Sequence, residues 1–399
     1  MEKPVWIGGV GMISAIGNSV PEALQAIEQG RSGIGPMRWL PSAHKDVFPV
    51  AEVKLSNGDL ADYTGMPCGI TRTALLGVAA ATEAFKSIEH LLHPTFKTGL
   101  LSATTVGGMD KTTHFFKEFL KNQSGGRLRN VVYHECGSPT ELVAEKLGIR
   151  DFITTISTAC SSSANSIMMA ARMIQHGMLD VAIAGGVDAL STFTLNGFNT
   201  LMILDKAYCR PFDNSRNGLN LGEGAAFLVL LSESALKTMG IEPLCRISGW
   251  HNATDAYHQT ASSPDGIGSC IAMRGALEKA RLQPEDIGYI NVHGTGTVNN
   301  DQSEGTAMKQ IFGEKMPRFS SSKSFTGHTL GASGGVEAVL SVLALKHGLI
   351  YPNLRFSTPI EGLGLVPETH FQTGVDIRHV LSNSFGFGGN CTSLLFSKN

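Results

Sequence analysis

Short apolar strand patterns recur along the whole 399-residue chain, and helical patterns lie between them. This alternation is typical of a mainly parallel sheet covered by helices on both faces. A chain of this length can bury a large core, as one domain or as two halves. The strand patterns are Val5–Val10, Gly99–Val106, Ile153–Ser157, Val181–Gly185, Ala225–Leu231, Leu244–Trp250, Ile287–Val292, His379–Ser384 and Thr392–Phe396.

A faint internal echo predicts two similar halves, residues 1–240 and 241–399. Val5–Gly9 recurs loosely as Arg246–Trp250, and in each half a helix and then a strand with a Gly/Thr turn follow. Next comes a reactive-looking residue before a long helix, Cys160 in one half and His328 in the other. We therefore expect an active site between the strand ends of the two halves.

Composition narrows the class of protein. Hydrophobic residues make up 42% of the chain and 46 residues are glycine, which suits a compact α/β enzyme with many tight turns. A net charge of −2 gives no sign of a nucleic-acid partner. The 7 cysteines lack Cys-x-x-Cys spacing, which indicates a reducing compartment and no zinc site. Without a signal-peptide pattern or an apolar run of membrane-spanning length, we expect a cytoplasmic protein.

The run Ser157-Thr158-Ala159-Cys160-Ser161-Ser162-Ser163 is the strongest indication of chemistry. It lies between the strand pattern Phe152–Ile156 and a helical pattern over Ala164–His176. The free N–H groups and the dipole of such a helix favour thiolate over thiol, so Cys160 is a candidate nucleophile. Considered alone, a buried structural cysteine at a helix start is the commoner outcome.

Two histidine motifs and a glycine-rich motif follow. Asn291–Thr297 contains His293, and Lys323–Glu337 contains His328 just before a helix that we expect to stop at Gly348. The third motif reads Asn383-Ser384-Phe385-Gly386-Phe387-Gly388-Gly389-Asn390. Each histidine alone is better explained as a structural residue, and glycine-rich turns are common.

Together and in this order, the four motifs resemble the β-ketoacyl-acyl-carrier-protein synthases, the elongating Cys-His-His branch of the condensing enzymes. The resemblance covers essentially the whole chain. It implies an α/β thiolase-like fold, two βαβαβ halves in five αβαβα layers. The initiating branch has asparagine where His328 falls, and thiolases have a second reactive cysteine near the C-terminus, where this chain reads Phe385–Gly389.

The resemblance implies a decarboxylative Claisen condensation, in which an acyl group on Cys160 reacts with malonyl-acyl carrier protein. His293 and His328 would donate to the enolate oxygen left by loss of carbon dioxide. Lys323 would polarise the site with Glu337 as its charge partner. The backbone N–H groups of Cys160 and Phe387 would form the oxyanion hole. The substrate-contacting residues are Thr295 and Thr297 for the pantetheine arm, Val106 and Met109 for the acyl tunnel, and Phe385.

We expect no metal and no permanently bound cofactor. Two histidines could be metal ligands, but no carboxylate or third histidine shares their motifs. Substrates would arrive on the phosphopantetheine arm of acyl carrier protein. Since carrier proteins of this pathway are acidic, docking should use local positive charge. The candidates are Arg72, Lys206, Arg210 and Arg216. The alternative is that they are ordinary solvated charges or, for Arg210 and Arg216, fold-supporting ion pairs.

We expect an obligate dimer, either a homodimer or a pair with a sister ketosynthase-like chain. In the resembled family the strand Ile153–Ser157 pairs across a two-fold axis, and the insertion Gly108–Gly137 reaches toward the partner's acyl pocket. Hiding an edge strand in this way also satisfies its backbone groups.

Several positions depart from the family's common pattern. They are Asn390 and Cys391 after the glycine-rich turn, the segment Arg216–Leu219, and Gly222–Gly224. These favour a specialised ketosynthase for a polyene-like or polyketide product over the housekeeping fatty-acid enzyme. Two other classes stay open, a non-catalytic chain-length subunit and a thiolase-like acyltransferase. The first normally lacks the cysteine, and the second needs a better-placed C-terminal cysteine than Cys391.

Overall fold

The computed structural model describes residues 3–399, so the first two residues of the predicted half 1–240 lie outside it. The first part of the chain contains β1 (Val5–Ser14), α1 (Val20–Glu28), α2 (Asn57–Thr64), α3 (Arg72–Lys86), β2 (Thr98–Ala103), α4 (Met109–Lys121), α5 (Gly137–Leu147), β3 (Phe152–Ile156), α6 (Ser162–Gln175), β4 (Val181–Asp188), α7 (Thr192–Thr200), β5 (Gly224–Ser232) and α8 (Glu233–Met239). The second part contains β6 (Cys245–Thr254), α9 (Ile267–Ala280), β7 (Tyr289–Asn291), α10 (Val298–Phe312), β8 (Arg318–Ser320), α11 (Lys323–Thr326), α12 (Ser333–His347), β9 (His379–Phe385) and β10 (Asn390–Ser397).

The strand order reveals an internal duplication. The strands follow one another as β3-β2-β4-β5-β1-β6-β10-β9-β7-β8. If β6 to β10 are counted as the first to fifth strands of a second unit, both units have the same order from their outer edge inward. The two units meet where β1 pairs with β6. The expectation of two similar halves from the weak sequence echo is therefore confirmed at the level of topology.

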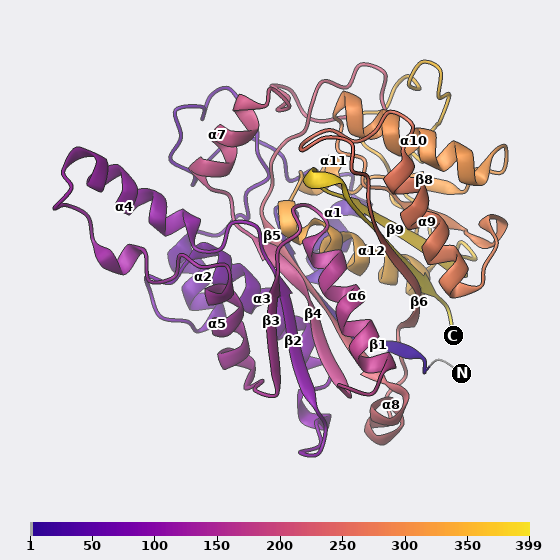
Figure 1. The fold of residues 1–399 in the computed structure, drawn as a ribbon, viewed down its shortest axis with the longest axis horizontal. Helices are drawn as coiled ribbons and strands as arrows, with labels where there is room; N and C mark the ends of the chain where they lie inside the picture. Colours follow the sequence, from indigo (N-terminus) through magenta and orange to yellow (C-terminus); the bar gives the residue numbers. More distant parts are fainter. Residues whose placement is uncertain (1–2) are drawn as a thin grey trace.

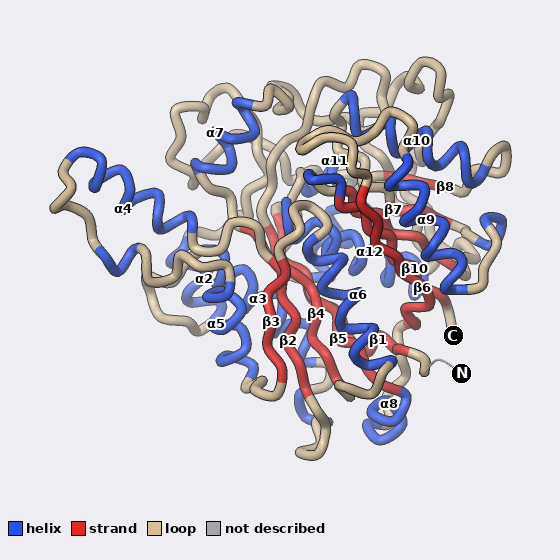
Figure 2. Tube along the Cα trace, in the orientation of Figure 1, coloured by secondary structure: helices blue, strands red, loops and turns tan. Residues whose placement is uncertain are grey.

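Helices fill three layers around the two halves of the sheet. The helices α6 and α12 pack against each other and contact strands of both halves, so they form the central layer (Figure 1). On the outer faces, α3 covers β1, β4 and β5, whereas α9 covers β6 and β10 (Figure 2). The result is the predicted αβαβα arrangement. Helix α12 is buried from Ser333 to Leu345, and this enclosure explains why its sequence is apolar on nearly all sides.

Three apolar clusters correspond to the spaces between these layers. The central one joins α6 and α12 to strands of both halves and includes Ile7, Ile167, Val339 and Phe396. A second lies beneath α3, and a third lies beneath α9. At roughly 25 cal/mol per Å² of buried apolar surface, the shared central cluster makes a large contribution to holding the halves together.

The sheet is mixed, and the expectation of a mainly parallel sheet is wrong. Only β2, β3 and β4, and their counterparts β7, β8 and β9, run parallel. In each half the fifth strand returns antiparallel, and the β1–β6 junction is antiparallel too. All predicted strands are present, but β8 was not predicted because Phe319 is its single apolar residue.

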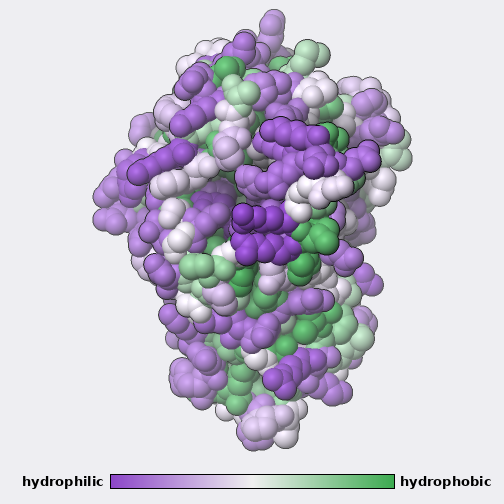
Figure 3. Space-filling view, turned by 90° about the vertical axis from the view of Figure 1, so that its left-hand side faces the viewer, coloured by the Kyte–Doolittle hydropathy of each residue, from purple (hydrophilic) through white to green (hydrophobic). Residues whose placement is uncertain are grey.

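The insertion after β2 forms an arm that projects from the body of the molecule (Figure 1). Its helix α4 has no buried residue. Large apolar side chains on the arm are exposed, namely Phe116, Leu120, Leu128 and Val132. Figure 3 views this side and shows apolar patches next to a central hydrophilic group. The neighbouring edge strand β3 exposes Ile153. Among residues 3–399, no helix is long and apolar enough to cross a membrane.

Candidate active site

Cys160 lies on a strained turn between β3 and α6. The preceding residue, Ala159, has a φ of 54°, a left-handed conformation that non-glycine residues rarely adopt. Ser162 helps to hold the turn, because its hydroxyl donates to the carbonyl of Ala159 and accepts from the N–H of Thr158. The turn places the buried sulfur of Cys160 at the start of the central helix α6.

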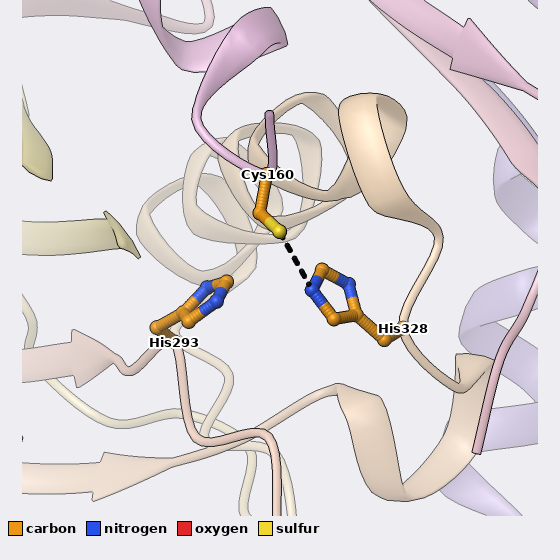
Figure 4. A group of neighbouring side chains, drawn as sticks. All are labelled: Cys160, His293 and His328. Carbon is orange, nitrogen blue, oxygen red and sulfur yellow. Dashed lines mark hydrogen bonds between the residues drawn. The ribbon is translucent and has the colours of Figure 1, made fainter. Parts of the chain in front are cut away.

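His328 comes from the equivalent turn of the second half, just before α12. Its Nε2 atom lies 3.1 Å from the sulfur of Cys160 (Figure 4). Glycine makes this approach of the two central helices possible. A Cβ atom on Gly334 would lie 2.9 Å from both the backbone nitrogen and the Cβ of Ala164. The N-terminal turns of the two helices therefore meet next to the reactive sulfur.

His293 completes the group from the loop after β7. Its ring is nearly perpendicular to that of His328, with 5.3 Å between the ring centroids. Behind it, the ammonium of Lys323 donates to the His293 carbonyl at 2.6 Å and lies 3.2 Å from Nδ1. Glu337 forms an ion pair with Lys323, and all these side chains are buried. Ser333 and Ser384 donate to the Glu337 carboxylate, so this charge is well satisfied.

The hydrogen bonds fix the tautomer of both imidazoles. His328 Nδ1 accepts the backbone N–H of Leu330, and His293 Nδ1 faces the ammonium of Lys323. Each ring therefore carries its proton on Nε2. Burial and the charge of Lys323 hold the pKa of both histidines well below the ordinary value. Two neutral rings thus offer Nε2–H donors next to the cysteine.

The thiol is not the preformed thiolate expected from its position at a helix start. Burial raises the pKa of Cys160 to about 11, although the Phe387 N–H and the charge of Lys323 act in the opposite direction. The loss of hydration is the largest contribution because the sulfur is enclosed. The expectation of a lowered pKa is therefore wrong, and the resting group at neutral pH is the thiol.

The glycine-rich turn after β9 packs directly onto the cysteine turn. The Phe387 N–H points at the sulfur of Cys160. A Cβ atom on Gly386 would lie 3.1 Å from the Cys160 nitrogen and 3.2 Å from the Thr158 carbonyl oxygen, so only glycine fits without displacement. The Phe387 N–H of the second half therefore faces the sulfur of the first half, which is a position suited to a donor of an oxyanion hole.

A metal is poorly suited to this group. The ligand-type atoms of Cys160, His293 and His328 do lie within 4.8 Å of one another. A metal ion, however, needs the lone pairs of nitrogens that carry protons here, and the ammonium of Lys323 already contacts His293. The expectation of a metal-free site stays a prediction.

A cavity of about 350 Å³ leads to Cys160, and both histidines line it. The structure places Thr295, Thr297 and Phe385 on its wall. Phe387 also lines it and stacks on Phe198, with 5.5 Å between the ring centroids. The cavity is of the size that holds a small ligand.

The two predicted tunnel residues lie elsewhere. Val106 and Met109 belong to an apolar group, here called the loop cluster, which continues from one wall of the cavity. Its buried members are Met37, Phe48, Val50, Val106, Leu190, Leu195, Leu204, Leu219, Leu221 and Leu330, with Leu40, Met109, Phe198 and Ile203 packed against them. Phe198, Ile203 and Leu219 also line the cavity. An acyl chain longer than the cavity would have to enter this cluster.

Two of the four predicted docking residues are buried, and for them the prediction is corrected. Arg72 forms a buried ion pair with Glu223. Arg216 donates to the Thr297 and Val298 carbonyls and supports the loop beside the cavity. The remaining two are accessible. Lys206 is exposed, and Arg210 is partly exposed next to Asp205.

Sequence reasoning missed two buried carboxylates that hold the His293 loop. Glu304 accepts the N–H groups of His293 and Gly294, and Asp301 accepts those of Thr295 and Gly296. Both lie on α10, directly after the histidine motif. Their neighbours along the chain, Asn299, Asn300, Gln302 and Ser303, are polar, so no local pattern marks these two acids as buried.

Asn390, noted as a departure from the family pattern, also has hydrogen-bond partners in both halves. Its side-chain oxygen accepts from Ser161 Oγ, Asn165 Nδ2 and Asn252 Nδ2. It therefore links the cysteine turn of the first half to β6 of the second.

Comparison with known families agrees with this geometry. Residues 2–235 match the family described as "Beta-ketoacyl synthase, N-terminal domain", and residues 244–357 match "Beta-ketoacyl synthase, C-terminal domain". The chain is also similar to the 3-oxoacyl-[acyl-carrier-protein] synthase 2 of Staphylococcus aureus (strain COL). The two are 32% identical over 411 residues, which cover 99% of this chain and 98% of the relative.

Solved structures give the same result. The ishigamide ketosynthase/chain length factor superposes with a TM-score of 0.93 at 28% identity, with all of both chains covered. A ketosynthase in complex with its chain length factor, from Xenorhabdus doucetiae, has a TM-score of 0.86 at 32% identity. That match covers 100% of this chain and 98% of the other.

Proposed function

This chain belongs to the β-ketoacyl synthase family, and we propose on that basis that it catalyses decarboxylative Claisen condensation. It joins an acyl group held as a thioester on Cys160 to malonyl-acyl carrier protein. The products are a β-ketoacyl-acyl carrier protein and carbon dioxide. The observation that carries the proposal is the contact of 3.1 Å between the Cys160 sulfur and His328 Nε2, with His293 alongside, at the end of an open cavity.

The first half-reaction transfers the acyl group. The Cys160 sulfur attacks the incoming thioester carbonyl, and the N–H groups of Cys160 and Phe387 stabilise the oxyanion. The carrier's thiol leaves, and the proton of Cys160 passes to it. This exchange is proton-neutral overall, because the proton lost by the Cys160 thiol is gained by the carrier's thiol.

The second half-reaction forms the carbon–carbon bond. The malonyl carboxylate leaves as carbon dioxide, and its bonding electrons move into the thioester carbonyl. The Nε2–H groups of His293 and His328 stabilise the resulting enolate oxygen. The enolate carbon then attacks the acyl carbonyl on Cys160, the bond from that carbon to sulfur breaks, and the departing sulfur takes up one proton from solvent. Lys323 and Glu337 act as positioning residues because they hold the His293 ring.

The substrates reach this site on a carrier protein. The pantetheine arm would run along Thr295 and Thr297, whose hydroxyl oxygens lie 2.9 Å apart on the cavity wall. Lys206 and Arg210 are the remaining docking candidates for an acidic carrier. No permanently bound cofactor is part of the proposal, since every step uses groups of this chain and the carrier's own arm.

We propose that the protein works as a dimer, with itself or with a sister ketosynthase-like chain. The edge strand β3 and the projecting arm around α4 both expose apolar side chains on the same side of the molecule (Figure 1, Figure 3). Light scattering coupled to size exclusion tests this assembly. A stable, fully active monomer at micromolar concentration would contradict it.

The departures at Asn390, Arg216–Leu219 and Gly222–Gly224 support a specialised polyene-like or polyketide product.

Seven free cysteines support a reducing compartment, for which we propose the cytoplasm.

Intact-mass measurement after incubation with a panel of acyl carrier-protein thioesters tests the proposal. We expect one acyl mass on the wild-type chain and none on Cys160→Ala. The size and unsaturation of the best acyl donor would identify the product class. A covalent acyl-enzyme on the alanine variant would show that another residue is the acceptor.

A further inference from the structure

One further buried carboxylate near the site, Asp188, has no role in the chemistry described so far. Asp188 ends β4 and is fully buried. Its Oδ1 accepts from Thr104 Oγ1 at 2.6 Å, Thr105 N at 2.9 Å and Val106 N at 3.1 Å. Its Oδ2 accepts from Thr105 Oγ1 at 2.5 Å and Gly331 N at 2.7 Å. The five donors are all uncharged.

These donors belong to two different parts of the site. Thr104–Val106 is the loop after β2, and Val106 is a member of the loop cluster. Gly331 lies three residues after His328, and Leu330, directly before Gly331, is in the same cluster. Leu330 has a φ of 52°, so this segment is already strained. Asp188 is thus a single group that holds both the loop cluster and the segment carrying His328.

The arrangement requires a carboxylate, and an amide of the same shape could not replace it. Each oxygen of Asp188 faces at least one backbone N–H, from Thr105 and Val106 on one side and from Gly331 on the other. An asparagine would point its NH₂ group at one of these donors in either orientation. A buried carboxylate without a cationic partner is costly to keep unless its hydrogen bonds are complete.

We propose that Asp188 is a positioning residue that couples the acyl chain to His328. An acyl chain on Cys160 that outgrows the cavity presses on the loop cluster, and Asp188 transmits this displacement through Gly331 to the His328 segment. Acyl length then sets how well the Nε2–H of His328 is aimed at the enolate oxygen. The inference rests on the proposed condensation and adds a determinant of chain-length selectivity to it.

The test compares Asp188→Asn with a matched control, Asp213→Asn. Asp213 is also fully buried and also accepts five neutral hydrogen bonds, from Ser215, Ser357 and Thr358, and none of these donors belongs to the loop cluster or lies near His328 in the sequence. Each variant is acylated with a short or a long acyl thioester. Release of carbon dioxide from malonyl-pantetheine is then measured, together with the alkylation rate of unacylated Cys160 and the melting temperature.

For Asp188→Asn we expect carbon dioxide release to fall about ten- to hundredfold, since a displacement of about 1 Å can cost roughly a hundredfold in rate. The rate of carbon dioxide release by the long-chain acyl-enzyme, divided by that of the short-chain acyl-enzyme, should move toward one. The alkylation rate of unacylated Cys160 should change little. Asp213→Asn should keep the wild-type ratio. An unchanged ratio in Asp188→Asn, or the same change in the control, would overturn the proposal.

Two further variants keep the test decisive if Asp188→Asn does not fold. A Cβ atom on Gly331 would lie 2.8 Å from Asp188 Oδ2, so Gly331→Ala pushes on the same contact without changing charge. Thr105→Val removes only the hydroxyl donor. Both should shift the chain-length ratio in the direction of Asp188→Asn, and wild-type ratios in both would refute the coupling. If Cys160 of the wild-type protein took up no acyl group at all, that result would instead count against the proposed function.

Discussion

The two halves of the molecule share one topology but contribute different groups at equivalent positions. The turn before the central helix holds Cys160 in the first half and His328 in the second. The loop after the second strand holds Thr104–Val106 in one half and His293 in the other. The scaffold therefore brings equivalent turns together, and only their side chains decide which half supplies the nucleophile and which supplies the donors.

The helices that follow those loops differ just as clearly. In the second half α10 packs on α9 and supplies Asp301 and Glu304, which hold the His293 loop. In the first half α4 projects outward without a buried residue. In the second half the loop is thus held by carboxylates of the helix that follows it, whereas in the first half the loop is followed by an exposed arm.

The division of roles between the halves is tested most strongly by His293→Ala and His328→Ala. Removing one preorganised donor costs roughly a hundredfold to a thousandfold in rate, so decarboxylation should fall by that amount in each variant. Acylation of Cys160 should fall much less, because it depends on the backbone donors. Separate assays of carbon dioxide release and intact mass measure the two steps. Equal losses in both would mean that the histidines serve the nucleophile.

The state of the nucleophile itself is tested by pH. With the pKa of Cys160 raised to about 11, the thiolate fraction should rise about tenfold per pH unit below that value. The alkylation rate of Cys160 by iodoacetamide should therefore increase about a hundredfold from about pH 7 to about pH 9. Cys160→Ala gives the background from the other cysteines. A rate that is already flat above neutral pH would show that the helix terminus outweighs burial.

The buried ion pair behind His293 should matter for stability as well as chemistry. Glu337→Gln leaves the ammonium of Lys323 buried without its counter-charge, and breaking one side of a buried pair costs about 3–5 kcal/mol. Denaturant unfolding measures this loss. The double variant Lys323→Met with Glu337→Gln should recover part of it. If the free energy of unfolding falls less in Glu337→Gln than in the double variant, the ion pair does not stabilise the second half.

The smallest effect concerns docking. Lys206→Glu should raise KM for carrier-bound substrate about two- to fivefold, since an exposed charge pair contributes up to about 1 kcal/mol. A pantetheine thioester without the carrier should show no change. Lys315→Glu is the control, because Lys315 is exposed near the start of β8, away from the strand ends that hold the site. Equal effects on both substrates would exclude Lys206 from docking.

Much of this arrangement was accessible from the sequence, because the motifs were local. The strand, turn and helix around Cys160 could be predicted from neighbouring residues, and so could the helix stop at Gly348, which adopts the left-handed conformation that suits glycine. The nine predicted strands were found with small shifts at their ends.

The remaining features depend on contacts between distant segments. The raised pKa of Cys160 follows from enclosure by both halves, which no local pattern encodes. Arg72 looked like a surface charge until the fold placed it on Glu223. The bonds of Asp188 join residues more than eighty positions away on one side and more than a hundred on the other. The antiparallel return of β5 and β10 likewise depends on pairing that the strand patterns did not specify.

The position of β10 has a consequence for how the protein is made. This strand comes last along the chain, yet it lies inside the sheet between β6 and β9, and its Leu394 and Phe396 fill the central cluster shared with α6. While the ribosome is still producing the second half, the inner face of α6 has no α12 or β10 to cover it. The nascent chain therefore carries an exposed apolar surface through most of its synthesis, the kind of surface that chaperones bind. Removal of the last strand should leave a protein that aggregates rather than a smaller enzyme.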